Sequence, residues 1–205
     1  MRGIKILCTA LAVICVICAN LPAQGGIKGG FDTSQFYSVK PAGLDQNWIT
    51  GFQLGLFVDI MKPSSYVQIR PELIYIRKGT KLSFTEPYSV AKIKIDYLEL
   101  PVLAQFNLLP NKTINPYIIA GPYVALRTWA KRLTENSTSI KEDIKDLVEP
   151  WDFGLIGGVG VEYKMDHTLD RILLEVRYEW GLTDIDKSTD RAKNNSFLFS
   201  VGVGF

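Results

Sequence analysis

Apolar and polar residues alternate with a period of two along most of the chain, which is the pattern of β-strands that have two different faces. In the segment 171–182, apolar residues such as Leu174 fall on one face, and charged residues such as Glu175 and Arg177 fall on the other. The last segment, 199–205, alternates Phe and Val with Ser and Gly. The alternation predicts an all-β fold in which each strand separates two environments.

Eight segments carry this pattern, at 26–35, 48–61, 65–78, 92–109, 115–129, 151–164, 170–182 and 196–205. Each is close to, or longer than, the roughly 9–11 residues of a tilted membrane strand. The short connections are 62–64, 110–114 and 165–169. The long connections are 36–47, 79–91, 130–150 and 183–195. Short periplasmic turns and long extracellular loops are typical of outer-membrane barrels. We therefore predict an eight-stranded antiparallel transmembrane up-and-down β-barrel with both termini in the periplasm.

Aromatic residues at the predicted strand ends support a membrane location, because their rings favour the interface between lipid and water. The tryptophans lie beside the long connections, and two other aromatic residues lie at the opposite ends. The predicted girdle residues are Trp48, Trp129, Trp151, Trp180, Tyr163 and Phe205. A soluble sandwich or a lipocalin-like barrel also alternates. The many glycines on the polar faces, the long strands and the aromatic ends favour the membrane barrel.

The first 23 residues have the composition of a secretory signal peptide, with Arg2 and Lys5 before an apolar run and small residues before Gln24. The alternative is an N-terminal membrane anchor, although the run is shorter than a spanning helix needs. Residues 24–205 then form one barrel domain exported to the outer membrane. All three cysteines lie in the signal, and the mature domain has 21 basic and 21 acidic residues. This composition gives no indication of nucleic-acid binding.

Charged residues on the polar faces are predicted to point into the barrel, where eight strands leave a space that side chains fill. The predicted inward charges are Lys28, Asp32, Arg70, Glu72, Glu99, Arg127, Glu162, Arg171, Glu175, Arg177 and Glu179. Unpaired charges are costly in a narrow interior, and these six acids and five bases can pair. We expect a polar network that plugs the barrel. A proton or ion path and a buried acid–base pair for catalysis are the alternatives.

No catalytic, cofactor-binding or metal-binding residues are predicted. The one histidine, His167, falls in a predicted turn, and the mature domain has no cysteine. The glycine-rich stretch 157–162 lacks the Lys and the Ser or Thr of a phosphate-binding loop. These glycines are interpreted as small interior residues of a strand.

The connection 130–150 has a different pattern from the rest of the chain. Ser139 followed by Glu142 matches a helix capping box. The apolar face that would follow consists of Ile140, Ile144, Leu147 and Val148. We expect a short amphipathic helix that folds back as a lid or binds a protein partner.

Several stretches, in this order and spacing, resemble the PorT-like "porin family" of outer-membrane β-barrel proteins. They are IKGGFDTSQF, DYLELPVLAQFNL, PYIIAGPYVALR, DFGLIGGVGVEY, RYEWGLTDI and FLFSVGVGF. The resemblance implies an eight-stranded barrel in the outer membrane of Gram-negative bacteria, and PorT itself is associated with type IX secretion. It also implies that Phe205 is part of the C-terminal signal that the barrel-assembly machinery reads.

These observations predict a non-enzymatic structural or interaction component of the outer membrane. One version of this prediction is an accessory to protein secretion or envelope assembly. The expected partners are outer-membrane lipid, the barrel-assembly machinery during biogenesis, and a protein bound through 130–150. A small porin is the first alternative, and a lipid-modifying enzyme is the second.

Overall fold

The structure is a computed structural model that describes residues 23–38, 44–60, 65–84, 89–135, 139–144, 147–165, 170–184 and 192–205. The predicted signal peptide, apart from Ala23, and the predicted turn with His167 lie outside the described residues. Within these residues the structure has ten strands, which are β1 (Ala23–Ser38), β2 (Leu44–Asn47), β3 (Ile49–Ile60), β4 (Val67–Phe84), β5 (Ser89–Asn107), β6 (Ile114–Glu135), β7 (Ser139–Asp143), β8 (Trp151–Lys164), β9 (Arg171–Gly181) and β10 (Ala192–Gly204).

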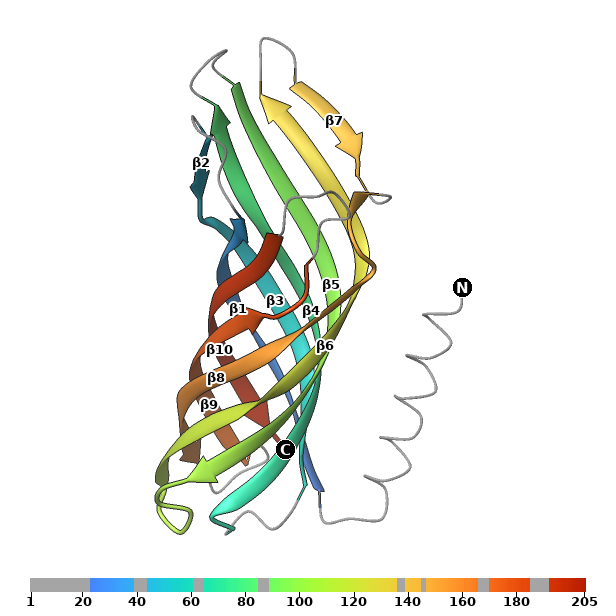
Figure 1. The fold of residues 1–205 in the computed structure, drawn as a ribbon. Coiled ribbons are helices and arrows are strands. Elements are labelled where there is room, and N and C mark those ends of the chain that lie inside the picture. Colours follow the sequence, from blue (N-terminus) through green and yellow to red (C-terminus); the bar gives the residue numbers. More distant parts are fainter. Residues whose placement is uncertain are drawn as a thin grey trace.

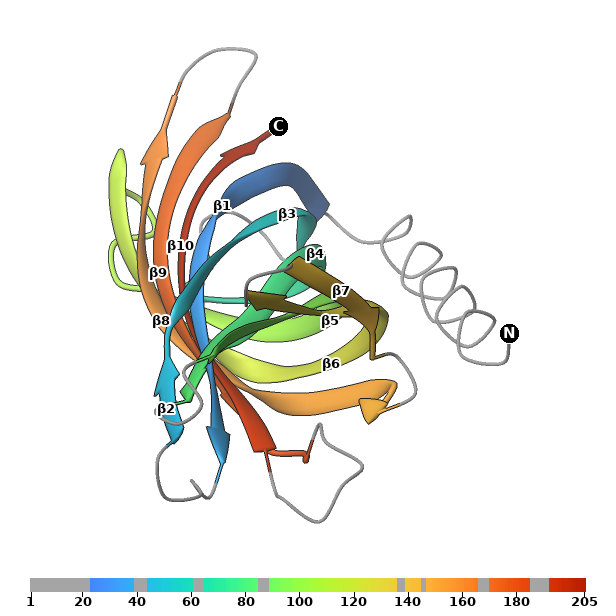
Figure 2. The same ribbon diagram turned by 90° about the horizontal axis from the view of Figure 1, so that it is seen from above.

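Eight of these strands close into an antiparallel barrel, in the order β1, β3, β4, β5, β6, β8, β9, β10 and back to β1. The ring of strands is visible along the barrel axis in Figure 2. At the closing seam, Phe31 of β1 pairs with Phe199 of β10 on one side and with Phe52 of β3 on the other. Each strand of this ring therefore has a hydrogen-bonded neighbour on both sides, which is the condition that a sheet must meet to span a bilayer. The predicted eight-stranded barrel is confirmed.

Both ends of the described chain lie at the same end of the barrel, which we call the turn end (Figure 1). The backbone N–H of Phe205 donates to the carbonyl of Gly25 at 2.9 Å, so the last residue is tied to the start of β1. We call the opposite end the loop end. No helix among the described residues is long and apolar enough to cross a bilayer.

Three strands run further at the loop end than the sequence predicts. β4 ends at Phe84, β5 begins at Ser89 and β6 ends at Glu135, so much of the expected connections 79–91 and 130–150 is strand. β2 pairs with the end of β4, and β7 pairs with the end of β6. The result is a five-stranded sheet above the ring, in the order β2, β4, β5, β6, β7, which we call the loop-end extension (Figure 1).

The predicted helix in 130–150 is wrong, because Ser139–Asp143 is strand β7. The pairing of β6 with β8 stops at Leu126, where it meets Trp151. Beyond that point the edge of β6 would be open, and an unpaired edge is unfavourable. β7 pairs with this edge, while Ile144 and Val148 are buried in the apolar core. The segment therefore folds back onto the barrel, but as a strand.

The outer face of the ring is apolar and exposed, with Phe31, Leu54 and Val159 each more than half exposed. Aromatic rings gather on this face near the loop end. Tyr178 lies 4.5 Å from Trp180 and 4.6 Å from Phe197, and Phe197 lies 5.7 Å from Trp48. Of the predicted girdle residues, Trp151 is half-buried. The exposed ones are Trp48, Trp129, Trp180, Tyr163 and Phe205.

Candidate functional site

The barrel interior holds most of the charged residues that the sequence places on the polar faces. Ten of the eleven predicted inward charges are at most 4% exposed. They are Lys28, Asp32, Arg70, Glu72, Glu99, Glu162, Arg171, Glu175, Arg177 and Glu179. They fall into two layers along the barrel axis, and a layer of amides lies closer to the turn end.

Arg127, the remaining predicted charge, is only half-buried and lies apart from these layers. The pairing of β5 with β6 shifts here, because Tyr97 pairs with Arg127 while Asp96 pairs with Trp129. Thr128 is the extra residue of this bulge, which re-aims the neighbouring side chains. The Arg127 guanidinium donates to the carbonyl of Val148 and so fixes the segment after β7.

Three buried charges are missing from the predicted set. Asp59 and Asp152 lie on the polar faces of their predicted strands, so the alternation pointed to them. Lys78 is the last residue of the predicted strand 65–78 and shares a face with Arg70 and Glu72. The continuation of β4 to Phe84 places it in the interior.

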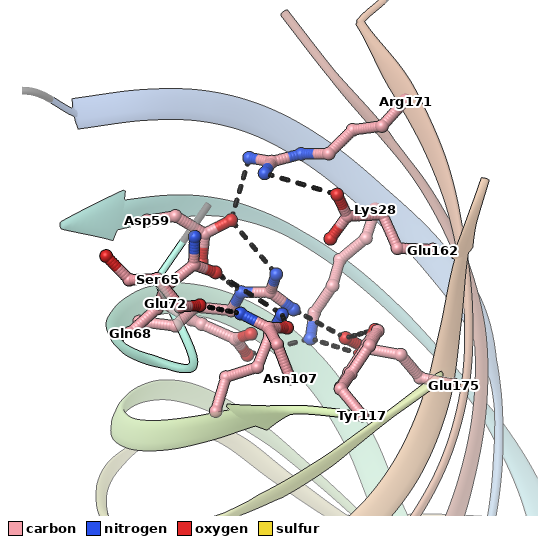
Figure 3. A network of polar contacts seen from close by, with 12 residues as sticks. Lys28, Asp59, Ser65, Gln68, Glu72, Asn107, Tyr117, Glu162, Arg171 and Glu175 are labelled. Atoms are coloured by element: carbon pink, nitrogen blue, oxygen red, sulfur yellow. Dashed lines mark hydrogen bonds and ion pairs between the residues drawn. The ribbon is translucent and has the colours of Figure 1, made fainter. Parts of the chain in front are cut away.

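Glu175 of β9 is the centre of the first layer (Figure 3). Its Oε1 accepts from Arg70 at 2.7 Å and from the Tyr117 hydroxyl at 2.6 Å. Its Oε2 lies 2.6 Å from Arg177 Nη2 and 3.3 Å from Lys28 Nζ. One carboxylate therefore contacts three buried cations, and charge-assisted bonds of this kind are the strong ones.

Two further carboxylates balance these cations. Glu72 of β4 accepts a hydrogen bond from each terminal nitrogen of Arg177 at 2.7 Å, and Lys28 Nζ lies 2.7 Å from Glu72 Oε2. Asp59 of β3 accepts from Arg70 at 2.6 and 3.0 Å, and its Oδ2 lies 2.7 Å from Arg171 Nη2.

The charges in this layer sum to zero. Its cations are Lys28, Arg70, Arg171 and Arg177. Its carboxylates are Asp59, Glu72, Glu162 and Glu175. We call these eight residues the balanced layer.

The pairs of the balanced layer cross the barrel. β4 and β9 are four strands apart in either direction around the eight-stranded ring, so they face each other across the axis. Arg70 and Glu72 of β4 contact Glu175 and Arg177 of β9 directly. These side chains fill the interior from wall to wall at this level.

Glycines on the inner face make room for the large side chains. A Cβ on Gly160 would overlap the ring of Tyr117, and a Cβ on Gly204 would overlap the side chain of Arg171. The glycines of 157–162 lie in strand β8. The sequence interpretation of these residues as strand glycines therefore matches their place in the fold.

Amide side chains form a layer nearer the turn end. Asn107 Oδ1 accepts from Gln105 at 2.7 Å and from Asn115 at 2.9 Å, and the amide of Asn107 donates to the carbonyl of Ser65 at 2.8 Å. These uncharged contacts join β5 and β6 to the segment that leads into β4.

The second charged layer lies closer to the loop end and contains one cation. Lys78 Nζ lies 2.6 Å from Glu99 and 2.6 Å from Glu179, again linking β4 to β9 across the axis. Asp152 accepts from Asn194 at 2.8 Å and from Thr183 at 2.7 Å.

Asp32 completes this second layer. Its carboxylate is buried and has no hydrogen-bond partner among the described residues. We call the set Asp32, Lys78, Glu99, Asp152 and Glu179 the acidic layer. The layer contains four carboxyl groups and one lysine, which pairs with Glu99 and Glu179.

Within the described residues, no group of His, Cys, Asp and Glu side chains has an arrangement that could hold a metal ion. The two charged layers are instead organised around Arg and Lys, which are cations themselves. The arrangement can bind the walls of the barrel together and block its interior.

A closed barrel with an exposed apolar outer face and a buried charged interior is the architecture of a transmembrane β-barrel. The chain matches the family model described as outer membrane protein beta-barrel domain over residues 19–187. The chain therefore belongs to this family, and it is an outer-membrane protein.

Two solved structures share the fold. Neisserial surface protein A is 13% identical, with a TM-score of 0.51, and the match covers 89% of this chain and 97% of that chain. OprG from Pseudomonas aeruginosa is 15% identical, also with a TM-score of 0.51, and the match covers 90% and 97%. No curated protein matches the chain.

We predict that Glu175→Gln strongly destabilises the barrel, because it leaves three buried cations without their shared carboxylate. Breaking a buried charge network in this way costs about 3–5 kcal/mol. The matched control is Glu142→Gln, which removes an exposed partner 3.8 Å from Arg132 and costs about 0–1 kcal/mol. Urea titration of the heat-modifiable gel shift in lipid vesicles measures both. Equal midpoints for the two variants would contradict the prediction.

The acidic layer gives a second prediction. Lys78→Met removes the one cation of the layer and should cost about 3–5 kcal/mol of unfolding free energy. The triple variant Lys78→Met, Glu99→Gln, Glu179→Gln should recover most of this loss, because neutral side chains of similar shape replace Lys78 together with both of its ion-pair partners. The same urea titration tests it. A triple variant less stable than the single one would show that the carboxylates stabilise the barrel independently of Lys78.

Proposed function

We propose that this protein is a non-enzymatic component of the outer membrane, a plugged barrel that presents its loop-end extension to a protein partner. The turn end faces the periplasm, so the extension stands on the cell surface. Short periplasmic turns and termini at that end are typical of bacterial barrels. The proposal includes a signal peptide at 1–23 and a C-terminal assembly signal at Phe205.

The observation that carries the proposal is the direct contact of β4 with β9 across the interior. It occurs at two levels, between Arg70 and Glu175 at 2.7 Å and between Lys78 and Glu179 at 2.6 Å. A solute path would have to break both. The interior therefore favours a structural plug over the small-porin alternative.

The loop-end extension supports the interaction role. Among the described strands β7 pairs with β6 alone, so its other backbone edge faces away from the sheet. An extended segment of a partner can add to such an edge through main-chain hydrogen bonds. Glu142 of β7 has an exposed side chain, and Leu147, which follows β7 in the chain, is 53% exposed.

An accessory role in protein secretion is the more specific version of this proposal. It rests on the resemblance of the sequence to PorT-like barrels. A component that docks secretion proteins requires an outward surface, which the loop-end extension supplies. It needs no open channel, which agrees with the plugged interior.

We predict that the purified mature protein gives no steady conductance in planar bilayers. A variant with Arg70→Ala, Glu72→Ala, Lys78→Ala, Glu175→Ala, Arg177→Ala and Glu179→Ala removes the contacts of β4 with β9 at both levels and should conduct. The control is Arg132→Ala with Glu142→Ala, an ion pair outside the plug. A gel shift on heating confirms that each variant is folded. Steady single-channel conductance from the unmodified protein would overturn the plug and favour a porin.

The partner is predicted to depend on β7. Pull-down from detergent-solubilised native membranes should recover secretion or envelope-assembly subunits with the unmodified protein. The yield should fall at least several-fold with Glu142→Pro, because proline removes a backbone N–H and distorts the strand. Lys112→Pro in the turn after β5 is the control. Equal recovery with both variants would place the contact elsewhere, and recovery of no such subunit by any form would count against the docking role.

A further inference from the structure

The outer wall of β4, β5 and β6 has a groove at the level where the apolar band ends. Its volume is about 470 Å³. It is lined by Tyr75, Arg77, Lys94, Asp96, Trp129, Lys131 and Leu133. None of these residues belongs to the interior layers, and the plug does not use them.

The strand register shows a change from apolar to basic along this wall. One row contains Tyr75, Leu98 and Leu126, and the next contains Arg77, Asp96 and Trp129. The row beyond contains Lys94 directly opposite Lys131. Trp and Tyr side chains mark the interface of a bilayer. The basic row therefore lies at the level of the lipid headgroups.

The lysines of the groove are placed against each other. Lys94 and Lys131 are cross-strand neighbours on one face, and one row further Lys81 lies opposite Lys92. Like charges in directly opposite positions destabilise a sheet. Among the described residues no carboxylate forms an ion pair with Lys94. The nearby Asp96 instead accepts two hydrogen bonds from Arg77, at 2.7 and 2.9 Å. An anion between the strands would relieve the repulsion.

Carboxylates near the groove do not balance its charge. Asp96 is the one acid of the lining, against Arg77, Lys94 and Lys131, so the lining carries a net charge of +2. Asp143 lies opposite Lys131 in the pairing of β6 with β7, at the rim. The Lys131 ammonium lies 4.3 Å from the centre of the Trp129 ring, which holds it over the groove.

We infer that this groove binds the phosphate group of an outer-leaflet glycolipid of the lipid A type. Arg77, Lys94 and Lys131 contact the phosphate, while the acyl chains lie on the apolar wall below Tyr75 and Trp129. Basic side chains at a membrane surface attract anionic lipid headgroups. The choice of outer leaflet rests on the orientation proposed above, but binding in detergent does not depend on that orientation.

Native mass spectrometry of the mature protein in detergent tests the inference, with bisphosphorylated lipid A and phosphate-free lipid A of the same acyl composition as probes. The unmodified protein should retain the phosphorylated lipid at least tenfold more strongly. The variant Arg77→Gln, Lys94→Gln, Lys131→Gln should lose on the order of a hundredfold of this affinity, at roughly fivefold per charge.

Lys112→Gln at the turn end is the matched control and should bind as the unmodified protein does. A gel shift on heating confirms that the variants are folded. Equal retention of the two lipids, or an equal loss with Lys112→Gln, would overturn the site. Competition by inorganic phosphate without any preference for lipid A would show a general anion site and would also overturn it. None of these results depends on conductance or on a protein partner.

Discussion

The direct contact of β4 with β9 across the barrel axis is the constraint on which the rest of the structure depends. Arg70 and Glu72 reach Glu175 and Arg177, and one level further Lys78 reaches Glu179. Charges buried this deeply are tolerated only when they are paired and hydrogen-bonded. The inward faces of the other strands therefore have to supply partners such as the Tyr117 hydroxyl, or glycines that leave space. The sequence of almost every strand reflects this requirement.

The two charged layers meet the same constraint in different ways. In the balanced layer three of the four carboxylates, those of Asp59, Glu72 and Glu175, are each shared between cations, and two opposite strands are joined by several strong bonds. In the acidic layer Lys78 serves Glu99 and Glu179, and Asp32 has no hydrogen-bond partner among the described residues. The balanced layer is thus the stronger connection between the walls. The acidic layer is the part of the interior whose electrostatics depend on a single side chain.

Much of this fold follows from period-two alternation, because each strand in the ring has lipid on one side and the charged interior on the other. The prediction was wrong where that contrast disappears. In the loop-end extension Ile95 and Ala130 point inward into the apolar core, so polarity no longer marks the faces, and the predicted ends of β4 and β6 fall too early. The helix prediction for β7 was wrong because this segment is extended only through its pairing with the open edge of β6, and the local sequence carries no sign of that pairing. The pattern could place Glu175 inside, but its three cations come from β1, β4 and β9, and that meeting depends on register and closure.

The strand that anchors the plug also forms the outer groove. On β4, Lys78 points into the barrel and ends in the acidic layer, while its neighbour Arg77 points outward and binds Asp96. Because side chains alternate along a strand, the interior contacts that fix the position of β4 also fix the height of Arg77 at the membrane surface. The greater length of β4, β5 and β6 then carries the opposed pair Lys94 and Lys131 beyond the apolar band. The interior contacts that hold the walls together therefore also determine the height of these basic side chains on the outer wall.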